Sequence, residues 1–143
     1  MKKIVILVMT FVMLMMIAVS ASAAKKDFVI RNAPCDENIT KYEIYKYNGG
    51  EGITKIGNDE TVKIKHSVRE SNAGYTNLIA AYCSDTGKSM GASWKPSDNQ
   101  YYLVSSGAIK SGQNYTACGR GNTKYLPGYP YITIQGTIDT YDD

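Results

Sequence analysis

The chain has 143 residues and a formal net charge of +3, and it contains 12 tyrosines, one tryptophan and 13 glycines. Two of its 16 basic residues and none of its 13 acidic residues lie within residues 1–23, so residues 24–143 hold 14 basic and 13 acidic side chains and carry a net charge of +1. A nearly neutral domain lacks the positive field that attracts nucleic acid. We therefore expect no nucleic-acid partner.

The N-terminus has the three-part order of a secretion signal. Two lysines, Lys2 and Lys3, precede an apolar run over residues 4–19, and Ala21-Ser22-Ala23 supplies the small residues of a peptidase site. The run of 16 residues is shorter than the ~20 that span a membrane. We predict that residues 1–23 are a signal peptide, cleaved after Ala23 or alternatively after Ala24. Residues 24–143 are then one secreted, extracellular domain without stable membrane insertion.

Residues 24–143 consist of short apolar segments separated by turn residues, as in 48–52 and 84–88. In chain order, the segments with strand character are 28–31, 41–47, 62–69, 75–83, a segment ending near Trp94, 101–105, 114–118 and 132–138. Seven or eight short strands at this spacing predict an all-β fold. We expect a single β-sandwich of antiparallel strands with Greek-key, immunoglobulin-like connections.

The clearest alternation lies in residues 62–69. One face carries Val62, Ile64, His66 and Val68, and the other carries Lys63, Lys65, Ser67 and Arg69. A period of two predicts one buried and one solvated face of a sheet. We therefore expect His66, the only histidine, to be a structural residue on the core side.

Three cysteines in an oxidising compartment allow one disulfide and leave one thiol over. Cys83 and Cys118 each end an apolar run just before a turn signal, whereas Cys35 follows Pro34 near the N-terminus. These positions favour a Cys83–Cys118 disulfide. The other two pairings, and three free thiols, remain open.

The sequence carries no motif for catalysis, metal binding or nucleotide binding. No G-x-S-x-G surrounds a serine, and any Ser-His-Asp or Cys-His mechanism would need His66, which we expect in the core. The histidine and cysteines lack zinc spacing, and the acidic pairs lack the spacing of a calcium loop. Residues 119–122 lack the G-K-[ST] of a phosphate loop. We predict a non-enzymatic protein without cofactor or metal.

Aromatic side chains are too numerous for one small core, so some of them are expected on the surface. Exposed Tyr and Trp offer a rigid apolar face with a polar tip, which suits sugar rings and protein partners alike. Strands also favour tyrosine for packing alone. The binding candidates are Trp94, Tyr101, Tyr129 and Tyr131.

Over residues 59–141 the organisation resembles a loosely defined group of small secreted proteins of Gram-positive bacteria. The resemblance rests on Val62-Lys63-Ile64 leading to Ser67, on Tyr75 and Tyr82 before the Asp85-Thr86-Gly87 turn, on the Asn122 loop, and on Gly136 in the last strand. It implies export and a β-fold, and it carries no catalytic or binding residue. Members of the group generally lack cysteines and have an aromatic residue at the position of Thr137 or Ile138.

The leading functional hypothesis is binding of an extracellular glycan, such as cell-wall polysaccharide, or of a protein partner through exposed aromatics. The alternative is a secreted antimicrobial, bacteriocin-like or immunity-type factor. A small hydrolase that uses paired carboxylates is the least favoured class. The ligand and the oligomeric state are not determined by these patterns.

Overall fold

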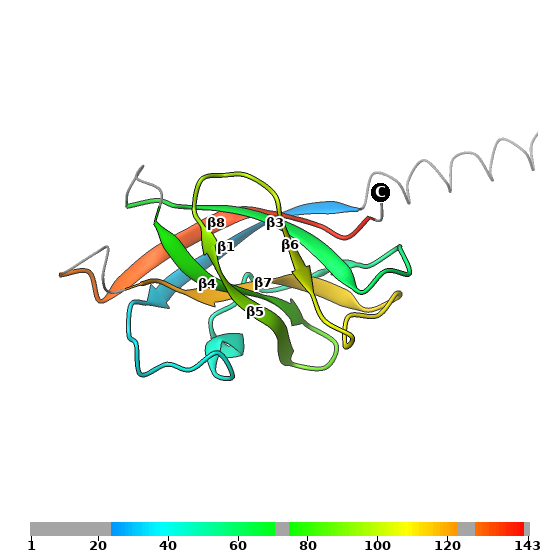
Figure 1. Ribbon diagram of the computed structural model, residues 1–143, viewed down its shortest axis with the longest axis horizontal. Helices are drawn as coiled ribbons and strands as arrows, with labels where there is room; N and C mark the ends of the chain where they lie inside the picture. The colour runs from blue at the N-terminus through cyan, green and yellow to red at the C-terminus, as the bar shows by residue number, and fades with distance from the viewer. Residues whose placement is uncertain (1–23, 71–74, 123–127, 142–143) are drawn as a thin grey trace, which may run out of the picture.

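Eight strands form two antiparallel sheets in the computed structural model, which describes residues 24–70, 75–122 and 128–141. The strands are β1 (Lys25–Pro34), β2 (Ile53–Thr54), β3 (Thr61–Val68), β4 (Thr76–Cys83), β5 (Lys88–Pro96), β6 (Tyr102–Ser105), β7 (Asn114–Arg120) and β8 (Tyr131–Asp139). One sheet has the order β1-β8-β3-β6 and the other β2-β7-β4-β5. The two sheets lie one above the other (Figure 1). The prediction of an all-β sandwich is confirmed.

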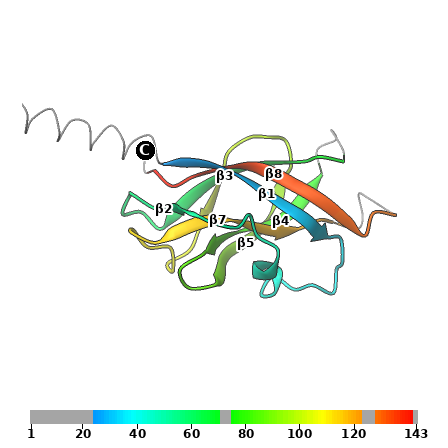
Figure 2. The ribbon, with the colours of Figure 1, turned by 180° about the vertical axis from the view of Figure 1, so that it is seen from behind.

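The connections run mainly between the sheets rather than within them. Only β4 and β5 are neighbours in both sequence and sheet, and every other pair of consecutive strands divides between the two sheets. Segments far apart in the chain therefore lie side by side, as β1 and β8 do along most of their length (Figure 2). Among the described residues, no helix is long and apolar enough to cross a membrane. The predicted signal peptide lies outside the described residues.

The period-two patterns predicted from the sequence set the core. In β3, Val62, Ile64, His66 and Val68 are buried while the residues between them are partly exposed. In β8, Ile132, Ile134 and Ile138 are likewise buried. They pack between the sheets with Ile79, Ala81, Tyr115 and other inward residues of β4 and β7.

The strand predicted at residues 41–47 is wrong. This segment forms turns and a short 3-10 helix, η1 (Ile44–Lys46). Thr40 donates to the Glu43 carboxylate from its backbone N–H at 3.1 Å and from its hydroxyl at 3.0 Å, and the Glu43 N–H donates to the Thr40 carbonyl at 3.0 Å. Polar side chains that bond to nearby backbone compete with a strand ladder. Ile44 is fully buried on the outer face of β4 and β7, and the segment covers this face (Figure 2).

The end of β1 and the presence of β2 also differ from the prediction. β1 continues through Asn32 to Pro34 instead of ending at residue 31, because Asn32 adopts a φ of 56° where the register shifts between Ile30 and Ala33. Asparagine tolerates this left-handed conformation better than most residues. The two-residue strand β2 lies outside the segments predicted as strands. β2 pairs with Tyr115 and Asn114 of β7.

Gly91 brings the two sheets together along one side. It has a φ of +69°, and a Cβ at this position would lie 2.7 Å from Val104 Cγ1 and 2.8 Å from the Ser105 carbonyl oxygen. Only glycine combines this backbone conformation with so close an approach. β5 therefore lies directly against β6 of the other sheet.

The predicted Cys83–Cys118 disulfide is absent, and all three cysteines are free and buried. In the β4–β7 ladder, Cys83 pairs with Tyr115, while Cys118 pairs with Ala80. Cys83 packs in the core between the sheets, but Cys118 packs with Ile44 on the outer face. The side chains of the two cysteines thus lie on opposite sides of one sheet, where no disulfide can join them.

Candidate functional site

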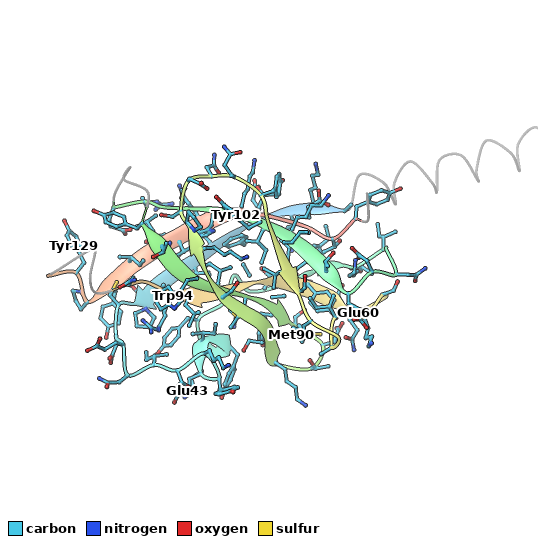
Figure 3. All side chains as sticks on the ribbon, viewed as in Figure 1. Glu43, Glu60, Met90, Trp94, Tyr102 and Tyr129 are labelled. Atoms are coloured by element: carbon cyan, nitrogen blue, oxygen red, sulfur yellow. The ribbon has the colours of Figure 1, made fainter. Side chains whose placement is uncertain are left out.

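The four aromatic candidates are all exposed, but they do not form one patch. Trp94 is 46 % exposed on β5, and Tyr101 is 39 % exposed just before β6 of the other sheet. Tyr129 lies just before β8 and is 51 % exposed, and Tyr131 is the first residue of β8 and is 57 % exposed. Figure 3 shows Tyr129 at the tip of this turn and Trp94 on β5.

Trp94 lies in a row of side chains that crosses three strands. Leu78 on β4 pairs with Trp94 on one side and with Arg120 of β7 on the other. The Arg120 Cζ lies 5.0 Å from the centre of the indole ring, within the range of a cation–π contact. The contact fixes one part of the indole, and nearly half of the side chain remains open to solvent.

Arg120 itself is only 8 % exposed. Its Nη1 donates to the Gly121 carbonyl at 3.0 Å, and its Nε has no hydrogen-bond partner among the described residues. Burial lowers the pKa of Arg120, and the carboxylates of Asp36 and Glu37 oppose this effect. An arginine keeps its charge in proteins. A cation therefore lies between the indole and these two carboxylates.

A hollow of about 530 Å³ opens beside these carboxylates. It is lined by Pro34, Cys35, Asp36, Glu37, Asn38, Ile39, Tyr47, Pro130 and Tyr131. Backbone hydrogen bonds hold its walls: the Cys35 N–H donates to the Pro130 carbonyl at 2.9 Å, and the Gly121 N–H donates to the Pro34 carbonyl at 2.9 Å. We call Trp94, Arg120 and the residues that line this hollow the Trp94 surface.

The polar groups of the hollow differ in how strongly they are engaged. Asp36 accepts from the backbone and side-chain nitrogens of Asn38, both at 2.9 Å, and so closes the turn. Glu37 is exposed. Burial raises the pKa of Cys35, and the nearby charge of Glu70 acts in the same direction. A thiol with a raised pKa is a poor nucleophile. The hollow thus offers carboxylate and amide groups beside aromatic rings and no activated nucleophile.

His66 lies away from this surface, in the core, as its alternation predicts. It is 1 % exposed, and neither ring nitrogen has a hydrogen-bond partner among the described residues. Burial lowers the pKa of His66 to about 4, although the Asp98 carboxylate and the Lys95 backbone favour the protonated ring. Within the described part of the chain, no group of three or more His, Cys, Asp or Glu side chains is placed to hold a metal ion.

The sequence singled out Trp94 and Tyr131 but missed Arg120, which lies beyond the strand predicted at residues 114–118. The pairing of Arg120 with Trp94 arises from the register of β5 and β7 on either side of Leu78. These residues are 26 positions apart in the chain. No local pattern reports such a contact, and only the alternation of β7 could have indicated that Arg120 and Cys118 share a face.

Comparison of the sequence with known protein families and with characterised proteins found no match.

Proposed function

We propose that this protein is a secreted, non-enzymatic binder of an extracellular glycan, and that the Trp94 surface is the binding site. The observation that carries the proposal is the exposed indole of Trp94, held from one side by the buried Arg120 at 5.0 Å. A ring that is fixed before binding loses little conformational entropy when a ligand stacks on it.

The groups around the indole fit the remainder of a sugar. A pyranose ring has apolar C–H faces that pack on an aromatic plane, and its hydroxyl groups need both donors and acceptors. Asp36, Glu37 and Asn38 supply acceptors and an amide within the adjoining hollow, and Tyr131 supplies a second exposed ring at its wall. This mixture of aromatic and polar groups is typical of ligand sites that fix orientation through a few polar contacts.

The experiment is a titration of the single tryptophan. Addition of soluble cell-wall polysaccharide should shift the Trp94 fluorescence in a saturable manner. Trp94→Ala should weaken retention on the immobilised polysaccharide by ~1–3 kcal/mol, as expected for an exposed anchor. Tyr141→Ala is the matched control, because Tyr141 is also an exposed aromatic, 53 % exposed, but follows β8 at its opposite end.

An unchanged fluorescence together with no retention of the wild-type protein on any wall polysaccharide would refute the proposal. Growth inhibition of related strains would then test the antimicrobial alternative.

A further inference from the structure

The outer face of the β1-β8-β3-β6 sheet carries a polar groove, whereas Trp94 lies on the other sheet. Two adjoining hollows of about 260 and 390 Å³ share Ser67, Asn99 and Gln135. The second hollow continues over Asp27, Lys65 and Thr137. We call these six residues the polar groove. Its two hollows together reach the usual size of a small-molecule site.

The floor of the groove is built from three neighbouring strands, β1, β8 and β3, with β8 in the middle. Asp27 of β1 and Lys65 of β3 both pair with Thr137 of β8, and Ser67 of β3 pairs with Gln135 of β8. The backbone of β8 is therefore bonded on both sides, so a peptide cannot add a strand in the middle of the floor, because strand addition needs a free edge. The wall is Asn99, whose N–H donates to the His66 carbonyl at 3.0 Å.

The side chains of the groove present donors and acceptors in equal measure. The Thr137 hydroxyl donates to Asp27 Oδ1 at 2.7 Å, which fixes both groups. Arg69 donates to Gln135 Oε1 from Nε at 3.3 Å and from Nη2 at 3.1 Å, so the Nε2 of Gln135 is the donor that it presents to a ligand. Asn99 and Ser67 each add both a donor and an acceptor.

The charge of the groove selects against a polyanion. The residues that line its two hollows include two cations, Lys65 and Arg69, and two anions, Asp27 and Asp98, so the lining carries no net charge. A phosphate or carboxylate polymer would meet the Asp27 carboxylate, whereas a neutral sugar hydroxyl can donate to Asp27 and accept from Lys65. Near Lys65, the ring of Tyr101 is exposed, with Lys65 Nζ 5.1 Å and Lys25 Nζ 5.8 Å from its centre.

We propose that the polar groove is a second binding site, for a neutral oligosaccharide, and that it acts independently of the Trp94 surface. It shares with the proposed function the class of ligand, a glycan, and no residue of the site. Because Trp94 lies on the β2-β7-β4-β5 sheet and the groove lies on the outer face of the other sheet, one molecule would hold two glycan chains at separate places on its surface. A monomer is then sufficient to cross-link a polysaccharide, and binding gains from two attachments.

The test is a titration of the 15N-labelled secreted protein with neutral hexasaccharides of glucose and of N-acetylglucosamine, and with an oligogalacturonate of equal length as the charged control. A neutral hexasaccharide should shift the side-chain amide signals of Asn99 and Gln135, and the shift should persist in Trp94→Ala. The oligogalacturonate should leave both signals in place.

Asn99→Gly is the site variant, because Asn99 has a φ of 60° and glycine keeps this backbone while removing the amide. It should weaken binding at the groove about tenfold, equal to one lost polar contact of 1.4 kcal/mol, and leave the Trp94 fluorescence response unchanged. Ser67→Ala is the second variant, and Gln100→Ala, an exposed amide next to Asn99, is the control.

Two results would overturn the second site: shifts confined to the surroundings of Trp94, or equal affinities for the wild type, Asn99→Gly and Ser67→Ala. Either result leaves the proposed function standing. A response of Asn99 and Gln135 without any response of Trp94 fluorescence supports the groove and refutes the Trp94 surface instead.

Discussion

Trp94 and Arg120 are register partners of the same residue, Leu78, on the two sides of β4. Their side chains meet above Leu78, which is left only 6 % exposed. The contact therefore has two roles. It closes the small outer cluster of Leu78, Ala80, Cys118 and Ile44, and it holds the indole in position at the surface.

The two roles of Trp94 can be separated by measuring stability. Since Trp94 is 46 % exposed on an edge strand, Trp94→Ala should lower the free energy of unfolding by less than the ~3–5 kcal/mol typical of a buried tryptophan. Ile134→Ala, at a fully buried position, should cost ~2–5 kcal/mol. Urea denaturation followed by circular dichroism measures both. A loss at Trp94 larger than that at Ile134 would show that the indole is primarily a core residue.

Arg120→Met should change binding more than stability. The substitution removes a buried cation whose Nε has no partner among the described residues, and it keeps most of the side-chain volume. The substitution removes the desolvation penalty of a buried charge, which stabilises the fold, and it loses a cation–π contact of ~0.5–2 kcal/mol, which destabilises it. These two effects nearly offset each other. The indole should then become more mobile, which raises the depolarisation of Trp94 fluorescence and weakens glycan retention. Unchanged retention would mean that Arg120 does not position the indole.

Stability should fall in mild acid because of His66. Its pKa is about 4 in the folded protein, against 6.5 for a solvent-exposed histidine, because burial disfavours the charged ring. In the unfolded chain His66 thus binds a proton as the pH falls below about 6.5, whereas in the folded chain it binds one only near pH 4. The folded state is fully favoured above this window and loses up to about 3 kcal/mol as the pH falls through it.

Urea midpoints measured at intervals across this window test the prediction. His66→Leu should flatten the curve between pH 6.5 and about 4, because the titrating ring is removed. The Asp98 carboxyl, whose pKa is lowered chiefly by the hydrogen bond from the Tyr102 hydroxyl, acts below this range and remains in the variant. An identical slope in His66→Leu would assign the acid sensitivity to other groups.

All three cysteines should behave as protected thiols. Cys83 and Cys118 are fully buried and Cys35 is 7 % exposed, and burial raises the pKa of Cys35 and of Cys118. Iodoacetamide should label the native protein slowly and should label three thiols per chain in urea without reductant. Mass spectrometry of the intact chain counts the adducts. A Cys83–Cys118 peptide in a non-reducing digest would contradict the strand register described above.

A side chain at Gly136 should destabilise the fold. It lies in β8 between His66 of β3 and Phe28 of β1, and a Cβ would overlap the Lys65 carbonyl oxygen and lie 2.8 Å from His66 Cα. Gly136→Ala should therefore cost about 1–3 kcal/mol, as overpacking does. Gly107→Ala is the matched control, because its nearest neighbour, Glu60 Oε2, is 3.6 Å away. Equal thermal midpoints of the two variants would show that β3 and β8 can separate without loss.

Signal cleavage should leave Ala24 as the first residue. Ala24 is 3 % exposed, and its carbonyl accepts from the Thr140 N–H at 2.9 Å and from the Thr140 hydroxyl at 3.3 Å. Cleavage after Ala24 would remove this acceptor and expose the end of β1. The intact mass of protein from culture medium distinguishes the two sites, and Met1 in the secreted material would refute export by a cleaved signal.

The sequence predicts the strands of this fold where burial differs between two faces. The alternation in 62–69 and 132–138 identified β3 and β8 and put His66 on the core side, because a buried face must repeat every second residue. The same alternation at 41–47 gave a wrong prediction of a strand, because the Glu43 carboxylate accepts a hydrogen bond from the Thr40 N–H and the chain forms turns and η1 there. Only a local competition between side-chain and backbone bonds decides between these outcomes.

The candidate sites were less accessible to prediction because they depend on register. Trp94 could be named from its residue type, but its contact with Arg120 requires that β5 and β7 flank β4 in one alignment. The polar groove likewise joins Asp27, Ser67, Asn99 and Gln135 from four segments. The wrong prediction of a Cys83–Cys118 disulfide has the same origin. The face of the sheet on which each cysteine side chain lies depends on the register of the strands, which the sequence alone does not give.

The close approach at Gly91 has a consequence for self-association. β5 and β6 are edge strands of different sheets, and at Gly91 they are in close contact with one another. This contact leaves less of their backbone open to pairing with another chain. The other two edges are blunted as well, β2 by its length of two residues and β1 by the irregularity at Asn32 and by Pro34 at its end. Unpaired edges are where β-proteins aggregate. The described edges thus leave copies of this chain few open backbone groups through which to pair with one another.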